Sequence, residues 1–337
     1  MTLSGATTQQ SWNWRSRRLR AIAWQVLALA VIGVGAWFLI HNTLVNMRAR
    51  GIHSGFDFLS GPAGFDIGES PVPYDSADPY WKAFAVGVLN TLRVAVIGIV
   101  AATLLGTLAG VGRLSRNAIL RGLCHAYVEL FRNVPVLLQL LMWYILFTEV
   151  LPPIDEAIGL APGVFISKSG LSCPWPVWVP GHGFALEVPV RGEVVIEGGA
   201  ALTPEFLSVL IGLVIYTGTF IAEVVRAGIQ AIPRGQIEAA TALGLSRRQQ
   251  LRLIIMPQAL RVIIPPLTNQ YLNLTKNSSL AVAIGYPDVV SISNTALNQT
   301  GRAVECIALI MAVYLALSLA TSALMGWYNR RAAIRER

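Results

Sequence analysis

The sequence predicts an all-α integral membrane protein with about six transmembrane helices. Of its 337 residues, 54% are hydrophobic and only 13% are charged, whereas soluble domains carry about 25% charged residues. Several stretches contain no charge or one charge over at least about 18 residues, and about 20 apolar residues are enough to cross a bilayer. The basic residues gather in alternate loops, which is typical of a chain that crosses a membrane repeatedly.

The six spans are predicted at residues 21–40, 84–111, 124–147, 206–229, 259–284 and 303–328. The first follows an arginine-rich flank, but its apolar run is longer than the roughly 7–15 residues of a cleaved signal peptide, and no A-x-A site follows. We therefore expect it to remain as a helix. The second span contains Arg93, the third contains Glu129 and Arg132, and the fifth contains Lys276.

The distribution of lysine and arginine predicts the orientation. The N-terminal flank, the loops near 112–121 and 226–261, and the C-terminal tail hold 17 of the 26 basic residues, and the three other loops hold six. Positively charged loops stay in the cytoplasm, so we expect both termini there. The net charge of +8 then follows from topology and does not indicate a nucleic-acid partner.

Two long outer loops, residues 41–83 and 149–205, are rich in glycine and proline, and their acidic residues outnumber their basic ones. In the second loop, Arg191-Gly192 predicts a hairpin turn, and Pro189 would confine that hairpin to an edge. Neither loop is long enough for an independent domain. We expect them to cap the outer mouth or to dock an external partner, and an inert spacer is the alternative.

The inner loop at residues 232–258 predicts two short helices. Pro233 suits a first helical turn, and Gly244 is a good left-handed stop. Between them lie helix-favouring residues, namely Glu238, Ala239, Ala240, Ala242 and Leu243.

The second short helix is predicted to start at Ser246, which forms a capping box with Gln249. Pro257 then breaks or kinks the chain before the fifth span. A basic helix–glycine–helix of this kind could dock into a groove of a cytoplasmic protein. An interfacial helix lying on lipid headgroups is the alternative.

Several motifs resemble those of one family. The spacing around the glycine stop is similar to the EAA loop of ABC importer permeases, with the matching residues Glu238, Ala239, Ala240, Gly244, Ile254 and Pro257. Further matches to the polar amino acid subfamily lie at residues 89–92, 129–139, 222–228 and 276–280. The family usually has leucine in place of Met256, and often Gly-Thr in place of Asn133-Val134. The long outer loops and the additional first helix are similar to the general L-amino acid branch.

The resemblance implies a type I ABC importer permease fold in a bacterial inner membrane. A second permease subunit, similar but distinct, would pair with this chain, two ATPase subunits would bind below, and a periplasmic amino-acid-binding protein would deliver polar L-amino acids of broad specificity. The sequence contains no Walker motif. A partner would therefore hydrolyse ATP with Mg²⁺, and this chain would be a transport subunit without a cofactor or metal, and not an enzyme.

The resemblance also divides the chain. Residues 1–83 would hold the N-terminal tail, the first helix and a periplasmic loop, residues 84–330 the permease domain, and residues 331–337 a cytoplasmic tail. Within the permease domain, residues 149–205 would be a periplasmic insertion and residues 232–258 the coupling loop. The residues expected to couple to the ATPase are Glu238, Ala239, Ala240, Gly244, Leu245, Ser246 and Pro257.

Polar side chains inside two spans are candidates for a substrate path. On the fifth span, Asn269, Asn273 and Asn277 recur every four residues and therefore share one helix face, with Lys276 beside them. On the third span, three candidates lie near one face, namely Glu129, Arg132 and Gln139.

A zwitterionic amino acid needs a cation near its carboxylate, which Arg132 or Lys276 would supply, and an acceptor near its ammonium, which Glu129 or the asparagines would supply. The alternative is that these groups join helices or line a subunit interface. Glu223 and Arg226, three residues apart, are expected to pair with each other for structural reasons.

Other functions fit parts of the sequence. A secondary transporter predicts inverted repeats and its own ion path, and we find no clear repeat. An ABC permease for another small solute would share the coupling motif, whereas a membrane scaffold would not need the polar face of the fifth span. An enzyme is disfavoured because the cysteines have no metal-ligand spacing and the histidines are scattered, at His41, His53, His125 and His182.

Overall fold

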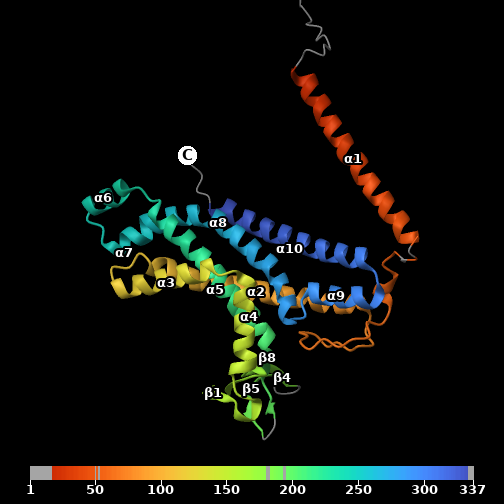
Figure 1. Ribbon diagram of the computed structural model, residues 1–337. Helices are drawn as coiled ribbons and strands as arrows, with labels where there is room; N and C mark the ends of the chain where they lie inside the picture. The colour runs from red at the N-terminus through yellow and green to blue at the C-terminus, as the bar shows by residue number, and fades with distance from the viewer. Residues whose placement is uncertain (1–16, 50, 52–53, 180–182, 193–194, 333–337) are drawn as a thin grey trace, which may run out of the picture. The chain divides into compact units, whose positions relative to one another are not determined.

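Figure 1 shows the computed structural model, which describes residues 17–49, 51, 54–179, 183–192 and 195–332. The chain divides into two compact units, Met1–Gly55 and Phe56–Arg337. The first unit contains the helix α1 (Arg17–Ala49), whose apolar side chains are exposed on every side. A helix that is apolar all round needs lipid or protein around it, and the stretch Arg20–Met47 is long enough to cross a membrane.

The second unit is built on two long helices, α2 (Tyr80–Gly112) and α5 (Pro204–Gln230). Glycine lets them approach closely. A Cβ atom at Gly106 would lie 2.6 Å from Ile221 Cβ and 2.7 Å from the Gly218 carbonyl oxygen. Small residues are a common contact between membrane helices because they allow the backbones to come together.

The number of membrane-length helices agrees with the prediction of about six spans. Five described runs are long and apolar enough, namely α1, α2, α5, the run Arg247–Ile284 and α10 (Ala303–Ala332). A sixth span results if two bent helices are counted together, α3 (Ala118–Asn133) and α4 (Val136–Ile145) with its π-helical extension η2 (Leu146–Val150).

The third predicted span is not the single helix expected at residues 124–147. α3 and α4 meet at an angle of 103°, with Val134 in extended conformation before Pro135. A residue that precedes proline is biased away from the helical conformation, which accounts for the break. α3 also starts earlier than predicted, because Asn117 Oδ1 accepts from the N–H of Ile119 at 2.9 Å and caps the helix.

The fifth predicted span is a composite helix. It runs from α7 (Arg247–Gln250) through the π-helical turn η4 (Leu251–Ile255) and α8 (Met256–Asn277) to the 3-10 helix η5 (Ser278–Ile284). Pro257 lies in the first turn of α8, directly after η4, and the residues before it are helical. The helix therefore continues through the break predicted at Pro257, although a proline there removes one backbone hydrogen bond.

A short helix that hydropathy does not predict follows η5. α9 (Val289–Thr300) begins at Asp288, whose Oδ1 accepts from the Ser291 N–H at 2.8 Å, and ends at Gly301 with φ +70°. Its asparagine and glutamine residues lower its hydropathy, so a search for apolar runs does not find it. The aspartate cap and the final glycine are nevertheless ordinary helix boundaries.

The insertion at residues 149–205 is mostly β-structure and not helix, which qualifies the all-α prediction. After the short helix η3 (Ile154–Glu156), a four-stranded antiparallel sheet has the order β1-β2-β3-β8. These strands are β1 (Ile158–Ala161), β2 (Val164–Ser167), β3 (Gly170–Cys173) and β8 (Ala200–Leu202). In Figure 1, α4 leads into these strands.

Two hairpins complete the insertion. β4 (Trp175–Val179) pairs with β5 (Gly183–Glu187), and β6 (Val190–Arg191) pairs with β7 (Ile196–Glu197). The second hairpin turns at Gly192, whose N–H donates to the Val195 carbonyl oxygen at 2.9 Å. A hairpin is present as predicted, but Arg191 belongs to β6 and the turn begins one residue later, at Gly192.

Candidate functional site

Residues 234–250 form two short helices joined by a tight turn, and we call them the knob. α6 (Arg234–Ala242) is followed by Gly244, which adopts φ +72°. The N–H of Leu245 donates to the Ala240 carbonyl oxygen at 3.1 Å and closes the turn. Residues other than glycine rarely adopt this left-handed backbone conformation. The glycine predicted to end the first helix therefore does so, and the prediction is confirmed.

The second helix of the knob starts at the predicted capping box. α7 (Arg247–Gln250) follows Ser246, whose N–H and hydroxyl both donate to Gln249 Oε1, at 2.9 and 2.7 Å. Gln250 Nε2 donates to Thr241 Oγ1 at 3.2 Å and so ties the second helix to the first.

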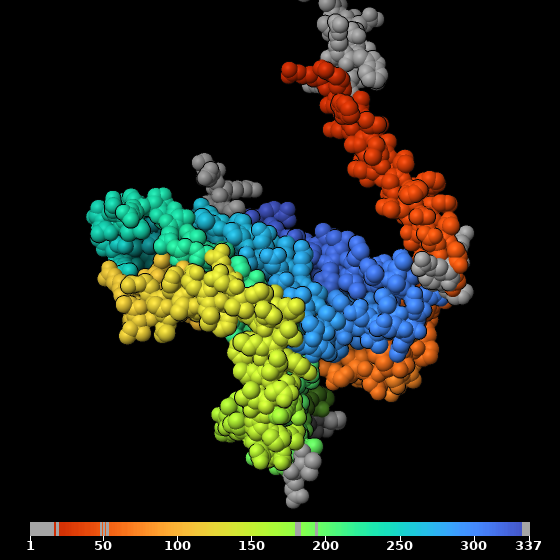
Figure 2. Space-filling view, in the orientation of Figure 1, coloured from red at the N-terminus to blue at the C-terminus, as the bar shows by residue number. Residues whose placement is uncertain are grey.

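Most of the predicted coupling residues are on the surface, and the knob projects at the upper left of Figure 2. The exposed ones are Glu238, Ala239, Gly244, Ser246 and Pro257, and Leu245 is half-buried. Ala240 is buried, so it supports the knob and does not face a partner. Leu243 is 78% exposed and presents an apolar contact that the sequence analysis did not assign; its signal was an apolar residue directly before the glycine stop.

The polar residues predicted on the fifth span lie on one face of α8. Asn269, Asn273 and Lys276 are exposed and Asn277 is half-buried, whereas Leu274 is buried. In the part of the chain that the structure describes, none of these four polar side chains makes a hydrogen bond or ion pair. Unpaired polar groups are costly in hydrocarbon, so this face meets water or another subunit.

The polar residues predicted on the third span are not brought together. Glu129 and Arg132 are exposed on α3, where the Arg132 guanidinium lies 5.3 Å from the centroid of the Phe220 ring. Gln139 is buried on α4. The bend separates Gln139 from α3, and the shared face expected of a continuous helix does not form.

Gln139 closes the break between α3 and α4. Its Nε2 donates to the carbonyl oxygens of Phe131 at 2.8 Å and Val134 at 2.9 Å. Carbonyl groups at the end of a helix lack hydrogen-bond donors within that helix. The Gln139 side chain supplies donors to two of these carbonyl groups. Gln139 Oε1 is buried without a partner among the described residues.

Glu223 pairs with Arg226 as its spacing predicted, and it also pairs with a residue that the sequence analysis missed. Arg113, which follows α2, donates to Glu223 Oε2 at 2.6 Å, and Arg226 donates to Glu223 Oε1. The two arginines thus share one carboxylate and join the ends of α2 and α5. A partner 110 residues away leaves no local pattern in the sequence.

Arg93, the charge inside the second span, also has a partner that the sequence analysis missed. Glu69, in the segment before α2, pairs with Arg93, and its second carboxylate oxygen accepts from the Thr203 hydroxyl. The Arg93 guanidinium also lies 4.2 Å from the centroid of the Phe206 ring. Glu69 thereby joins the segment before α2 to α2 itself and to the start of α5.

Comparison with known proteins identifies relatives over the length of the chain. Residues 102–334 match the family described as binding-protein-dependent transport system inner membrane component. The general L-amino acid transport system permease protein AapQ of Rhizobium johnstonii is 41% identical, over 97% of this chain and 96% of its own length. The putative amino-acid ABC transporter permease protein YhdX of Escherichia coli K12 is 42% identical, over 98% of this chain and 99% of its own.

A solved structure supports the same fold. The crystal structure of an amino acid ABC transporter with histidines matches with a TM-score of 0.56 and 25% identity, covering 75% of this chain and 95% of that chain. The family match includes the knob, the broken third span and the polar face of α8. The chain therefore belongs to the family of binding-protein-dependent transport system inner membrane components, with the type I ABC importer permease fold, and is a multi-pass transport subunit whose ATP is hydrolysed by separate subunits.

Proposed function

We propose that this chain is one of two permease subunits in an importer that carries polar L-amino acids of broad specificity. The support is that relatives named for amino acid transport match nearly the whole chain. The second permease would be a similar but distinct chain. A periplasmic amino-acid-binding protein would deliver the substrate at the outer face.

The proposed orientation places both termini in the cytoplasm of a bacterial cell and the chain in its inner membrane. The knob then lies on the cytoplasmic side, and residues 149–205 lie in the periplasm. The arginine-rich loops agree with this arrangement. Residues 84–330 would form the permease domain, flanked by residues 1–83 and by a cytoplasmic tail at residues 331–337.

The knob carries the proposal. It is a rigid helix–glycine–helix that projects from the helical bundle and leaves Glu238, Ala239 and Leu243 free for a partner. Such a shape fits a groove, which one of two ATPase subunits would provide. ATP and Mg²⁺ would be bound there and not by this chain. The full set of proposed coupling residues is Glu238, Ala239, Ala240, Gly244, Leu245, Ser246 and Pro257.

The exposed face of α8 supports a path for the substrate. We assign Asn269, Asn273, Lys276 and Asn277 to that path, with Lys276 as the cation for the substrate carboxylate. Glu129 and Arg132 on α3 are a second pair of the required charges. Gln139 is the weakest candidate, because both of its N–H donors are occupied at the break.

The test is transport by the complex purified from its native membrane and reconstituted in liposomes with its binding protein. We expect uptake of labelled glutamate, glutamine and histidine that needs ATP inside and continues when ionophores collapse the ion gradients. A secondary transporter would show the opposite dependence. Uptake that ignores ATP, or purification without any ATPase subunit, would refute the proposal.

A further inference from the structure

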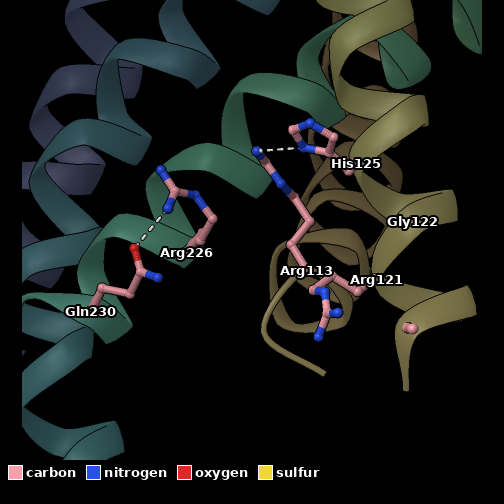
Figure 3. Close-up of a pocket in the computed structure, with 7 residues that line it drawn as sticks. Arg113, Arg121, Gly122, His125, Arg226 and Gln230 are labelled. Atoms are coloured by element: carbon pink, nitrogen blue, oxygen red, sulfur yellow. Dashed lines mark hydrogen bonds between the residues drawn. The ribbon is translucent and has the colours of Figure 1, made fainter. Parts of the chain in front are cut away.

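A basic pocket lies where the ends of α2, α3 and α5 meet. Its volume is about 460 Å³, and its lining includes Arg113, Arg121, His125 and Arg226. Figure 3 shows Arg226 with Gln230 on one side of the opening, and Arg113, Arg121 and His125 on the other. These three helix ends lie on the same side of the molecule as the knob, since α5 leads directly into it.

The charges around this pocket are not balanced. None of its lining residues is acidic, and Arg113 and Arg226 share the single carboxylate of Glu223. The guanidinium of Arg121 donates to the Ser115 carbonyl oxygen at 3.2 Å and makes no ion pair among the described residues. The pocket thus has three arginines in its lining and one carboxylate that pairs with two of them, which leaves two net positive charges to attract an anion.

The side chains are arranged for an anion with several oxygens. Arg113 is held in place, with 10% of its side chain exposed, and its second guanidinium nitrogen lies 3.2 Å from His125 Nδ1. The pocket is lined by arginines from α3 and α5 and by one that follows α2, and guanidinium groups suit a phosphate group, whose oxygens accept forked hydrogen bonds. The first turn of α3 borders the pocket at Ala118, and a helix start favours negative charge.

Apolar side chains next to the pocket indicate where that phosphate comes from. Ile119 and Leu123, one turn apart on α3, are 75% and 66% exposed, and they flank the lining residues Ala118 and Gly122. A phospholipid has both parts that this surface requires, an anionic headgroup and acyl chains. Basic pockets between membrane helices on the cytoplasmic side are known to bind such headgroups.

We propose that this pocket binds the headgroup of an anionic phospholipid of the inner leaflet, with Arg121, Arg113 and Arg226 around its phosphate. The assignment of the lipid to the inner leaflet depends on the membrane orientation proposed above. The binding of an anionic headgroup in this pocket does not depend on that orientation. The lipid would join the ends of α2, α3 and α5 at the membrane surface, close to the knob. Inorganic phosphate shares this chemistry and is the competing occupant.

Two variants test the pocket and leave intact the ion pairs of Glu223 with Arg113 and Arg226. Arg121→Gln removes the arginine that has no ion pair. Gly122→Leu adds a bulky side chain to a residue that lines the pocket, at a position where a Cβ atom would meet nothing within 4 Å, so we expect it to reduce the space for a headgroup. Arg330→Gln and Gly326→Leu are the matched controls on α10, since Arg330 is exposed and a Cβ atom at Gly326 also meets nothing.

The measurement is retention of cardiolipin by the whole complex, counted by native mass spectrometry after extraction from nanodiscs of cardiolipin and phosphatidylcholine. We expect each pocket variant to lower the affinity about five- to tenfold, since one arginine near anionic lipid contributes about 1 kcal/mol, while both controls retain the lipid. A parallel arm adds inorganic phosphate to complex in phosphatidylcholine alone.

Equal cardiolipin retention by the pocket variants and the controls would overturn the proposal. Binding of inorganic phosphate that these variants abolish, without any effect on cardiolipin, would assign the pocket to the free anion and also overturn it. Neither readout depends on transport, so the lipid site can fail while the importer assignment stands, and the reverse also holds.

Discussion

Single residues explain how charges are tolerated inside the spans. Arg93 forms an ion pair with Glu69 and lies over the Phe206 ring, and Glu223 forms ion pairs with two arginines. Lys276, in contrast, has no ion pair in the described part of the chain. Since an unpaired charge within a membrane costs about 2.5–3.5 kcal/mol on insertion scales, we expect its partner to lie outside the part of the chain that the structure describes. A substrate, water or a second subunit would meet that need.

Gly244 offers a test of the knob at the scale of one residue. Its φ is +72°, and a Cβ atom there would meet nothing within 4 Å, so Gly244→Ala costs about 1–2 kcal/mol through the backbone alone. We expect this variant to insert normally but to lose most ATPase association or most substrate-stimulated ATP hydrolysis. The measurement is the ATPase subunit recovered per permease, together with stimulated turnover.

Gly235→Ala is the control for this change. Gly235 is also exposed and a Cβ atom would again meet nothing, but it lies in α6 without a positive φ. Alanine favours a helix by about 1 kcal/mol over glycine, so this variant should couple normally. Full coupling by Gly244→Ala would show that the turn is not part of the contact with the ATPase.

At the scale of whole elements, hydropathy located the spans because burial in lipid demands long apolar runs. It did not reveal the break at Pro135, because α3 and α4 taken together are apolar enough for one span, even though α3 carries Glu129 and Arg132. α9 was missed for the opposite reason, since a short helix packed on neighbours needs no long apolar run. The knob and the pair of Glu223 with Arg226 were predictable because their contacts are local, whereas the pairing of Arg93 with Glu69 and of Arg113 with Glu223 depends on tertiary contacts.

The break between α3 and α4 depends on Gln139, which supplies two donors to carbonyl groups that the bend leaves free. Gln139→Met keeps the volume and removes both donors, so it should lower the stability of the complex by about 1–3 kcal/mol. The measurement is the midpoint of thermal unfolding in detergent. Gln270→Met, on α8, is the control because no hydrogen bond of its side chain occurs among the described residues.

The same pair of variants separates a structural role from a substrate role. If Gln139 acts only at the break, uptake per folded complex should keep its dependence on substrate concentration. An unchanged unfolding midpoint combined with weaker substrate affinity would instead return Gln139 to the substrate path.

At the scale of the whole molecule, the exposed helix faces differ in polarity. α10 exposes Leu315 and Leu319, each 60% exposed, and α8 exposes Asn269, Asn273 and Lys276. Only the first kind of surface is compatible with lipid. We therefore place α10 toward the bilayer and the polar face of α8 toward the centre of the complex, where two permease subunits would enclose the substrate path.

This placement predicts a difference in reactivity between two exposed positions. In a background without Cys124, Cys173 and Cys306, Asn273→Cys should react with a charged, water-soluble thiol reagent, and Leu319→Cys should react at least tenfold more slowly, because the thiolate forms in water and not in hydrocarbon. The measurement is the labelling rate in the assembled complex, with ATP and loaded binding protein present or absent.

If α8 lines an alternating path, the rate at Asn273→Cys should change between those states, whereas the rate at Leu319→Cys should not. A rate at Asn273→Cys as slow as that at Leu319→Cys, together with oxidative cross-linking to the partner permease, would place α8 in a sealed subunit interface and remove it from the path.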